Sequence, residues 1–219
     1  MGQQSEFSII IAVISLALSF IVAYFAYLSP SKPRMLVSRY MIFFHNYWTT
    51  SSGDKWGGIS FYLPITFYNW SPKGGSIFEV RLIIGRQDDP TKYFDISWAY
   101  FVQILQEQSR WENENVAQPI AISGQSSVSK VIRFDWSPNM GEKIDIEPGQ
   151  YKLLVLAWTR DTAKPNLRDS ISFVITREQS EQYQKYVEHN NNGVIEVPLG
   201  ETNRSNNVLT VKQIDRFYG

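Results

Sequence analysis

The side chains that carry most enzyme and metal chemistry are scarce in this sequence. Its 219 residues contain no cysteine and only two histidines, His45 and His189. The lack of cysteine excludes disulfides, thiolate metal sites, iron–sulfur clusters and cysteine nucleophiles. No nucleophile elbow, phosphate-binding loop, dinucleotide-binding glycine pattern, metalloprotease helix or calcium loop is present. We therefore predict a protein that is not an enzyme and that uses neither a cofactor nor a metal.

Two acidic stretches and one histidine are the remaining candidates for chemistry. Asp88, Asp89 and Asp95 could offer oxygen ligands to Ca²⁺, but they lack the alternation of a calcium loop, which favours a solvated acidic turn. The three glutamates between residues 107 and 114 could form a glycosidase pair, although a hydrated face is the simpler interpretation. His45 lies in an aromatic run and is interpreted as a strand histidine with a satisfied hydrogen bond.

Aromatic residues are abundant, with seven tryptophans and twelve tyrosines. Trp56 precedes two glycines and Trp70 follows Asn69, so both are expected in turns, where tryptophan rings of sandwich proteins stack on sugars. These two residues are candidate ligand-stacking positions for a carbohydrate. The alternative is that they cover the ends of the domain. Lys and Arg equal Asp and Glu at 21 each, and this balance predicts no nucleic-acid partner.

The clearest structural element in the sequence is an N-terminal apolar segment, which would fix the location of the rest of the chain. Residues 7–28 form a run of 22 without a charged side chain. As a helix it would span about 33 Å, which matches the hydrocarbon thickness of a bilayer. Residues 29–34 are rich in Pro, Ser and basic side chains and would end the helix. We predict a single transmembrane helix over 7–28, with the lipid bilayer as its partner.

Small residues recur along this segment at spacings of three and four. At about 100° per residue they fall on one stripe about 80° wide, which would allow close approach of another transmembrane helix or of a second copy. The helix-packing candidates are Ser8, Ala12, Ser15, Ser19, Ala23 and Ala26.

Flanking charge predicts which side of the membrane holds the rest of the chain. Residues 1–6 contain no Lys or Arg, whereas Lys32, Arg34 and Arg39 follow the apolar run. The positive-inside rule then favours a single-pass protein of the plasma membrane with its C-terminal domain in the cytoplasm.

From residue 35 onward, short runs rich in Val, Ile, Phe, Tyr and Trp alternate with Gly, Pro, Asn and Asp. This pattern is typical of strands and turns. It predicts a mainly β fold, an immunoglobulin-like antiparallel β-sandwich. The expected strands are 35–47, 59–68, 77–85, 92–97, 119–123, 128–136, 150–159 and 170–176. The expected segments are a tail 1–6, the helix 7–28, a linker 29–34, the sandwich 35–177 and a C-terminal helix plus strand pair 178–219.

Three local predictions refine this fold. Tyr151 follows a Pro-Gly turn at a strand start, as in the tyrosine corner, where the hydroxyl bonds a nearby backbone group. For residues 95–115 a short helix is favoured over a long strand. A capping box at 176–179 opens a helix to about His189, followed by a hairpin from 193–198 and 207–214 that pairs with a sheet edge.

The chain resembles a loose set of uncharacterised prokaryotic single-pass membrane proteins with an N-terminal anchor and one immunoglobulin-like sandwich. The matching pieces are residues 14–19, 63–69 and 148–158. This resemblance implies an architecture and no activity. Gly2 and Glu6 also resemble the N-terminal features of type IV pilin-like subunits, but no basic leader precedes Gly2.

Together these features predict a membrane-anchored, non-catalytic binding or assembly module within a membrane complex. The alternatives are an extracytoplasmic module that binds carbohydrate or another envelope component, and a pilin-like filament subunit.

Overall fold

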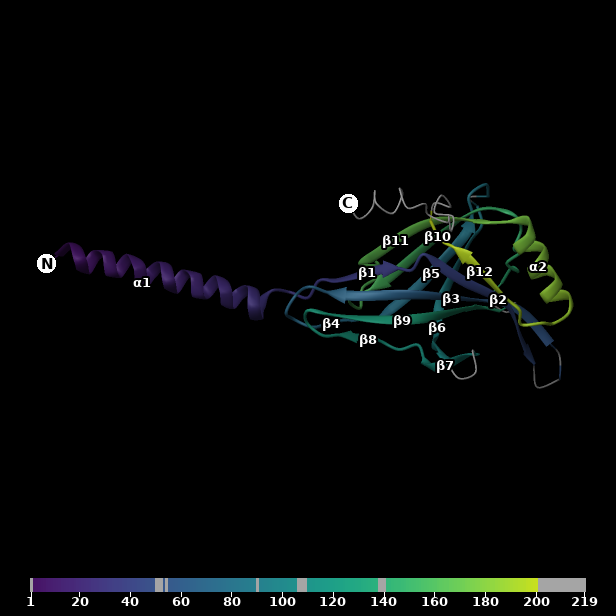
Figure 1. The fold of residues 1–219 in the computed structure, drawn as a ribbon, viewed down its shortest axis with the longest axis horizontal. Coiled ribbons are helices and arrows are strands. Elements are labelled where there is room, and N and C mark those ends of the chain that lie inside the picture. The colour runs from purple at the N-terminus through teal and green to yellow at the C-terminus, as the bar shows by residue number, and fades with distance from the viewer. Residues whose placement is uncertain are drawn as a thin grey trace, which may run out of the picture.

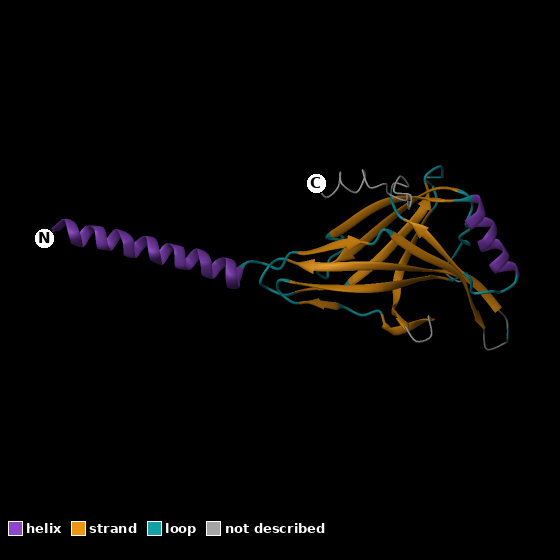
Figure 2. Ribbon diagram, in the orientation of Figure 1, coloured by secondary structure: helices purple, strands orange, loops and turns teal. Residues whose placement is uncertain are grey.

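The computed structural model describes residues 2–49, 53, 55–89, 91–105, 110–137 and 141–200. The helical elements are α1 Gly2–Ala23, a π-helical turn η1 Tyr24–Leu28, and α2 Arg177–Glu188. The strands are β1 Pro33–Val37, β2 Tyr40–Thr49, β3 Lys55–Asn69, β4 Gly75–Ile77, β5 Glu79–Arg86, β6 Tyr93–Leu105, β7 Arg110–Val116, β8 Ile120–Ile122, β9 Ser126–Trp136, β10 Gly149–Trp158, β11 Leu167–Ile175 and β12 Val194–Pro198. The prediction of a mainly β, antiparallel fold with a short C-terminal helix is confirmed (Figures 1 and 2).

Ten of the strands belong to one sheet that folds over on itself. Its order is β11-β10-β5-β6-β9-β3-β2-β12, with β1 beside β3 and β7 beside β6, while β4 and β8 form a separate pair. All of its pairings are antiparallel. The strands therefore form one continuous, barrel-like sheet, rather than the two separate sheets of the immunoglobulin-like sandwich that the sequence predicted.

The sheet turns its corner at strand β6. The first part of β6 pairs with β5, and its second part pairs with β9 and β7. The register on β9 shifts between Trp98 and Tyr100, and such a bulge lets a strand pass from one layer to the other. At the opposite edge the backbone N–H of Leu199 donates to Arg39 and that of Gly200 donates to Ser172, at 2.6 and 3.0 Å. The chain that follows β12 is therefore hydrogen-bonded to β11, so the two end strands of the sheet lie side by side.

Aromatic side chains cross the middle of the core as a ladder. Phe43, Phe61 and Phe134 pair across β2, β3 and β9, and Trp98 of β6 continues the row. The three phenylalanines are at most 1% exposed. Aromatic cross-strand pairs stabilise sheets beyond the area they bury, so this row contributes to the stability of this part of the sheet.

The expected single strand over 35–47 is two strands. Both β1 and β2 pair with β3, but their registers differ, and the break lies at Ser38, whose N–H donates to Pro64 at 3.0 Å. Pro64 has no N–H to return a ladder hydrogen bond. The break between β1 and β2 follows because Pro64 of β3 cannot donate a backbone hydrogen bond there.

The expected short helix within 95–115 is wrong. Residues 93–105 form β6 and residues 110–116 form β7, and the two pair as neighbours. Ile96, Phe101 and Val102 are buried. Hydrogen bonding to β5, β7 and β9 and burial of these side chains outweigh the helix propensity of Gln, Glu and Leu.

The C-terminal predictions are confirmed as far as the described residues extend. Thr176 and Gln179 form the capping box of α2, and Asn190, at φ 49°, follows its end. Residues 194–198 form β12 at the edge of β2. The expected strand 207–214 lies outside the described residues.

At the other end, α1 projects away from the sandwich (Figure 1). It continues directly into η1, which ends where Ser29 N–H donates to Tyr24 at 2.9 Å. Within the described part of the chain, no helix is both long and apolar enough to cross a membrane.

Candidate functional site

Two neighbouring cavities lie at the end of the sandwich away from α1, where β5 and β9 finish and β10 begins. The larger encloses about 400 Å³ and the smaller about 250 Å³. Lys143 and Ile144 line both, so the segment before β10 separates them. Together they form the candidate binding site.

Arg86 is the central cation of the larger cavity. It lies at the end of β5, where the antiparallel register places it opposite Tyr151 of β10. Its guanidinium donates to both oxygens of Asp88, at 2.9 and 2.6 Å, and also to Glu147. The hydrogen bond to Asp88 raises the pKa of Arg86, and the same bond lowers the pKa of Asp88. The cation is thus held between two carboxylates.

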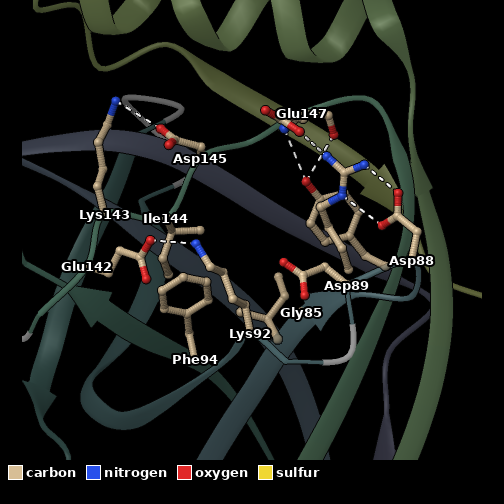
Figure 3. A pocket seen from close by; sticks show the side chains of 13 residues that line it. Gly85, Asp88, Asp89, Lys92, Phe94, Glu142, Lys143, Ile144, Asp145 and Glu147 are labelled. Atoms are coloured by element: carbon tan, nitrogen blue, oxygen red, sulfur yellow. Dashed lines mark hydrogen bonds and ion pairs between the residues drawn. The ribbon is translucent and has the colours of Figure 1, made fainter.

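Lysines complete the polar wall on the other side (Figure 3). Lys92 reaches across to Glu142 at 2.6 Å, and Lys143 pairs with Asp145 at 3.1 Å. The hydrogen bond with Glu142 raises the pKa of Lys92. The wall therefore alternates positive and negative groups.

The tyrosine corner fixes one edge of this cavity. The Tyr151 hydroxyl accepts from the backbone N–H of Glu147 at 3.1 Å and donates to its carbonyl at 3.0 Å. Burial raises the pKa of Tyr151, so the hydroxyl keeps its proton. The prediction made for Tyr151 is confirmed, and the corner positions the carboxylate that meets Arg86.

The smaller cavity is mainly apolar, with Ile59, Tyr183 and Val187 among its lining residues. His45 of β2 is 4% exposed and makes a backbone hydrogen bond with Gly58, as its sequence context predicted. Gly57 makes room for the ring, because a Cβ there would lie 2.7 Å from His45 Cε1.

We expect His45 to make the sandwich less stable in mild acid. Burial lowers its pKa below the ordinary value of 6.5, so the unfolded chain binds this proton more readily than the folded one. Its stabilising contribution is present above pH about 6.5 and is lost as the pH falls through the folded-state pKa, with a slope of at most about 1.4 kcal/mol per pH unit. Urea unfolding between pH 7.5 and 5, followed by tryptophan fluorescence, measures this loss.

The control for this prediction is the exposed His189, which caps α2 and contacts the Lys185 carbonyl at 2.7 Å. His45→Gln should flatten the pH dependence, whereas His189→Gln should leave it close to that of the wild type. Equal slopes in wild type and His45→Gln would contradict the assignment. The pKa values of Asp88 and Asp89 are lowered from 3.8, so these groups titrate below the measured range.

The site combines a wall of paired charges with a mainly apolar hollow. The cations of the larger cavity are engaged with carboxylates, and the smaller cavity holds an imidazole among apolar side chains. Among the described residues, no group of three or more His, Asp or Glu is placed to hold a metal ion. A mixed-charge wall beside an apolar hollow suits a ligand that has both polar and apolar parts.

The structure does not bring the two ligand-stacking candidates together. Trp56 lies near the start of β3 and Trp70 directly after its end, which separates them by roughly 45 Å along the strand. Trp70 is 76% exposed, while the side chain of Trp56 lies outside the described ones. A single sugar ring cannot contact both positions.

The helix-packing candidates lie on the helical segment as expected, with one departure. Ser8, Ala12, Ser15, Ser19 and Ala23 belong to α1 and are exposed. Ser19 Oγ donates to the carbonyl of Ser15 at 2.8 Å, within the helix. Ala26 lies in the π turn η1, where the rotation per residue differs from that of an α-helix.

The sequence did not predict that the segment around Arg86 and the segment around Tyr151 form one cavity. Each contains a feature visible in the sequence, the acidic turn at 88–89 and the tyrosine after a Pro-Gly turn, but no local pattern links the two. Their meeting depends on the β5–β10 register, which pairs Arg86 with Tyr151. The sequence gives one indirect indication: residues 86–92 and 142–147 both contain acidic and basic side chains close together.

Comparison with known proteins identifies no relative that assigns this site. No protein family profile matches the chain, and no curated protein matches it. Among solved structures, a β-glucosidase from Kluyveromyces marxianus is similar at 9% identity with a TM-score of 0.31. The match covers 78% of this chain and 15% of the β-glucosidase.

Proposed function

We propose that this protein is a single-pass, membrane-anchored β-sandwich that acts as a non-catalytic binding or assembly module. Residues 7–28 would hold it in the bilayer, and the cavities at the far end would contact a partner in a membrane complex. Flanking Lys and Arg favour a cytoplasmic position for the sandwich.

The observation that carries this proposal is the exposure of the N-terminal apolar side chains. Fifteen large hydrophobic residues between Phe7 and Leu28 are 50–79% exposed. Large apolar patches left open to water are rare in monomeric soluble proteins, because each exposed side chain forgoes about 1.5–3 kcal/mol of burial. Since at least half of each of these side chains is exposed, a bilayer is the cover that suits them best.

The shape of the segment also supports an anchor. No single described helix is long and apolar enough to span a bilayer, but the uncharged run continues through α1 into the π turn without an intervening loop. The helical backbone of the combined segment satisfies its own polar groups, as hydrocarbon requires. Tyr24, Phe25 and Tyr27 lie in its last turn, where aromatic rings favour the headgroup region.

The test is flotation of the full chain with membranes. The variant Ile11→Lys, Ile14→Lys and Leu18→Lys places three cations in the middle of the segment. Each costs about 2.5–3.5 kcal/mol at the centre of a bilayer, so we expect the variant to leave the membrane. After an alkaline wash, the wild type should float with vesicles in a density gradient, and the variant should remain at the bottom in folded form.

The matched control puts three lysines on exposed apolar positions of the sandwich, Leu36→Lys, Phe78→Lys and Val116→Lys. These side chains are 45–62% exposed, so this variant should float like the wild type. A wild type that stays at the bottom, or a helix variant that still floats, would refute the anchor. Native mass in mild detergent gives a second readout, since a membrane complex requires a mass above that of one 25.3 kDa chain in its micelle.

A further inference from the structure

The sandwich is joined to the anchor by a short linker. Only residues 29–32 lie between the end of η1 at Leu28 and the start of β1 at Pro33. Five Cα–Cα steps reach at most about 18 Å when fully extended. The headgroup region is roughly 5–7 Å thick on each side of the hydrocarbon core. The near end of the sandwich therefore has to lie close to the surface of the membrane that holds the helix.

Hydrogen bonds tie the linker to one turn of the sandwich. The hydroxyls of Ser29 and Ser71 lie 3.4 Å apart, and the Lys32 backbone N–H donates to Asn69 at 3.4 Å. Asn69 is 1% exposed and also donates to the Lys73 carbonyl at 2.7 Å. These contacts hold the turn between β3 and β4 beside the end of the helix (Figure 1).

The turn presents a tryptophan to its surroundings. Trp70 is 76% exposed, although its ring makes an edge contact with Tyr68 at 5.7 Å between centroids. An indole ring that is apolar in its body and polar at its N–H partitions favourably to the membrane–water interface. With residues 7–28 in the bilayer, the turn that carries Trp70 lies next to that interface, because it is hydrogen-bonded to the linker.

The same end is rich in basic side chains. The β10–β11 loop lies here, because Phe78 N–H, beside β4, donates to the Trp158 carbonyl at 2.7 Å. The exposed basic residues of this end include Lys32, Arg34, Lys73, Arg160 and Lys164, and Asp161 is an exposed acidic residue of the same loop. Within the described residues no carboxylate forms an ion pair with these five cations, whereas the cations around the far cavities are paired. Within the part of the chain that the structure describes, exposed basic side chains without an ion pair therefore lie next to the helix.

We propose that this end of the sandwich docks on the bilayer surface, with Trp70 in the interface and with Lys32, Arg34 and Lys73 against the phosphates of anionic phospholipids. The inference rests on the proposed anchor and adds a second, lipid-specific contact to it. Basic residues next to a membrane segment are attracted by anionic lipid within a Debye length. The docked surface would hold the sandwich in one orientation and turn its far cavities away from the membrane.

Quenching of Trp70 by brominated lipid tests this docking on the full chain. The chain is reconstituted in phosphatidylcholine vesicles with or without phosphatidylglycerol, with bromine near the headgroup end of the acyl chains. The signal of Trp70 is the difference in emission between wild type and Trp70→Phe, and the chain contains seven tryptophans in all. We expect this difference to be quenched in anionic vesicles, and to fall about two-fold or more in a variant carrying Arg34→Glu and Lys73→Glu.

Two controls separate failure of the docking from failure of the anchor. Arg177→Glu with Lys185→Glu reverses two exposed charges on α2, at the far end, and should leave the quenching unchanged. A chain that floats with vesicles but shows equal quenching in wild type and Trp70→Phe would overturn the docking and leave the anchor standing. Equal quenching of Trp70 with and without anionic lipid would overturn the role of the basic residues. A chain that does not float would overturn both.

Discussion

Replacing Phe61 by alanine should destabilise the sandwich by about 3–5 kcal/mol, the usual cost of removing a buried phenylalanine. Phe61 is 0% exposed and lies in the middle of the aromatic ladder, between Phe43 of β2 and Phe134 of β9. Its ring is tilted against Phe43 at 6.3 Å between centroids. Because both neighbours are fixed in the sheet, little can move in to fill the cavity. For a domain of this size we expect a loss of roughly 10 °C or more in melting temperature.

Phe78 provides the matched control for this substitution. It has the same side chain but is 45% exposed, so Phe78→Ala should change the unfolding free energy much less. Thermal unfolding followed by near-UV circular dichroism compares the two variants. Similar losses at the two positions would mean that the ladder is not a packed core.

Replacing Asp135 by alanine should cost about 2–4 kcal/mol, because it leaves two groups without their acceptor. Asp135 Oδ1 accepts from Ser60 Oγ at 2.5 Å and from Arg133 Nε at 2.7 Å. Ser60 is fully buried, and the Arg133 and Asp135 side chains are each 14% exposed. Arg133 also lies over the rings of Phe44 and Tyr100, at 5.9 and 5.4 Å. Without the carboxylate, this half-enclosed guanidinium has lost its counter-charge.

A double-mutant cycle and an exposed pair make this prediction specific. Arg133→Met in the Asp135→Ala background should recover part of the lost free energy, since it removes the uncompensated charge. Asp145→Ala breaks the Lys143–Asp145 pair, whose side chains are more than 60% exposed, and should change stability by no more than about 0.5 kcal/mol. Strictly additive effects at 133 and 135 would show that the pair does not act as a unit.

The two proposals divide the molecule by function. The end next to α1 carries the exposed Trp70 and basic side chains that form no ion pair among the described residues, whereas the far end carries the paired charges around Arg86 and the cavity at His45. If the near end faces lipid, the far end is the surface left free for a partner. The flotation and quenching experiments test this division from the membrane side.

Local sequence was sufficient where short-range forces decide the outcome. The capping box at Thr176 and the tyrosine corner at Tyr151 depend on residues three or four positions apart, and both form as predicted. Alternating apolar residues also predicted most strands, because burying one face of a strand requires a period of two. The apolar run from 7 to 28 is a property of composition alone.

The tertiary structure decided what depends on strand pairing. Residues 93–105 became a strand because neighbours on both sides satisfy its backbone, which no window of that segment reveals. The far cavity exists because the β5–β10 register brings Arg86 to Tyr151 from segments 65 residues apart. Trp56 and Trp70, close in the sequence, lie at opposite ends because an extended strand separates them. Local energetics, which a sequence shows directly, determined most of the elements. Register and sheet order, which are long-range, determined the strand at 93–105 and which side chains meet.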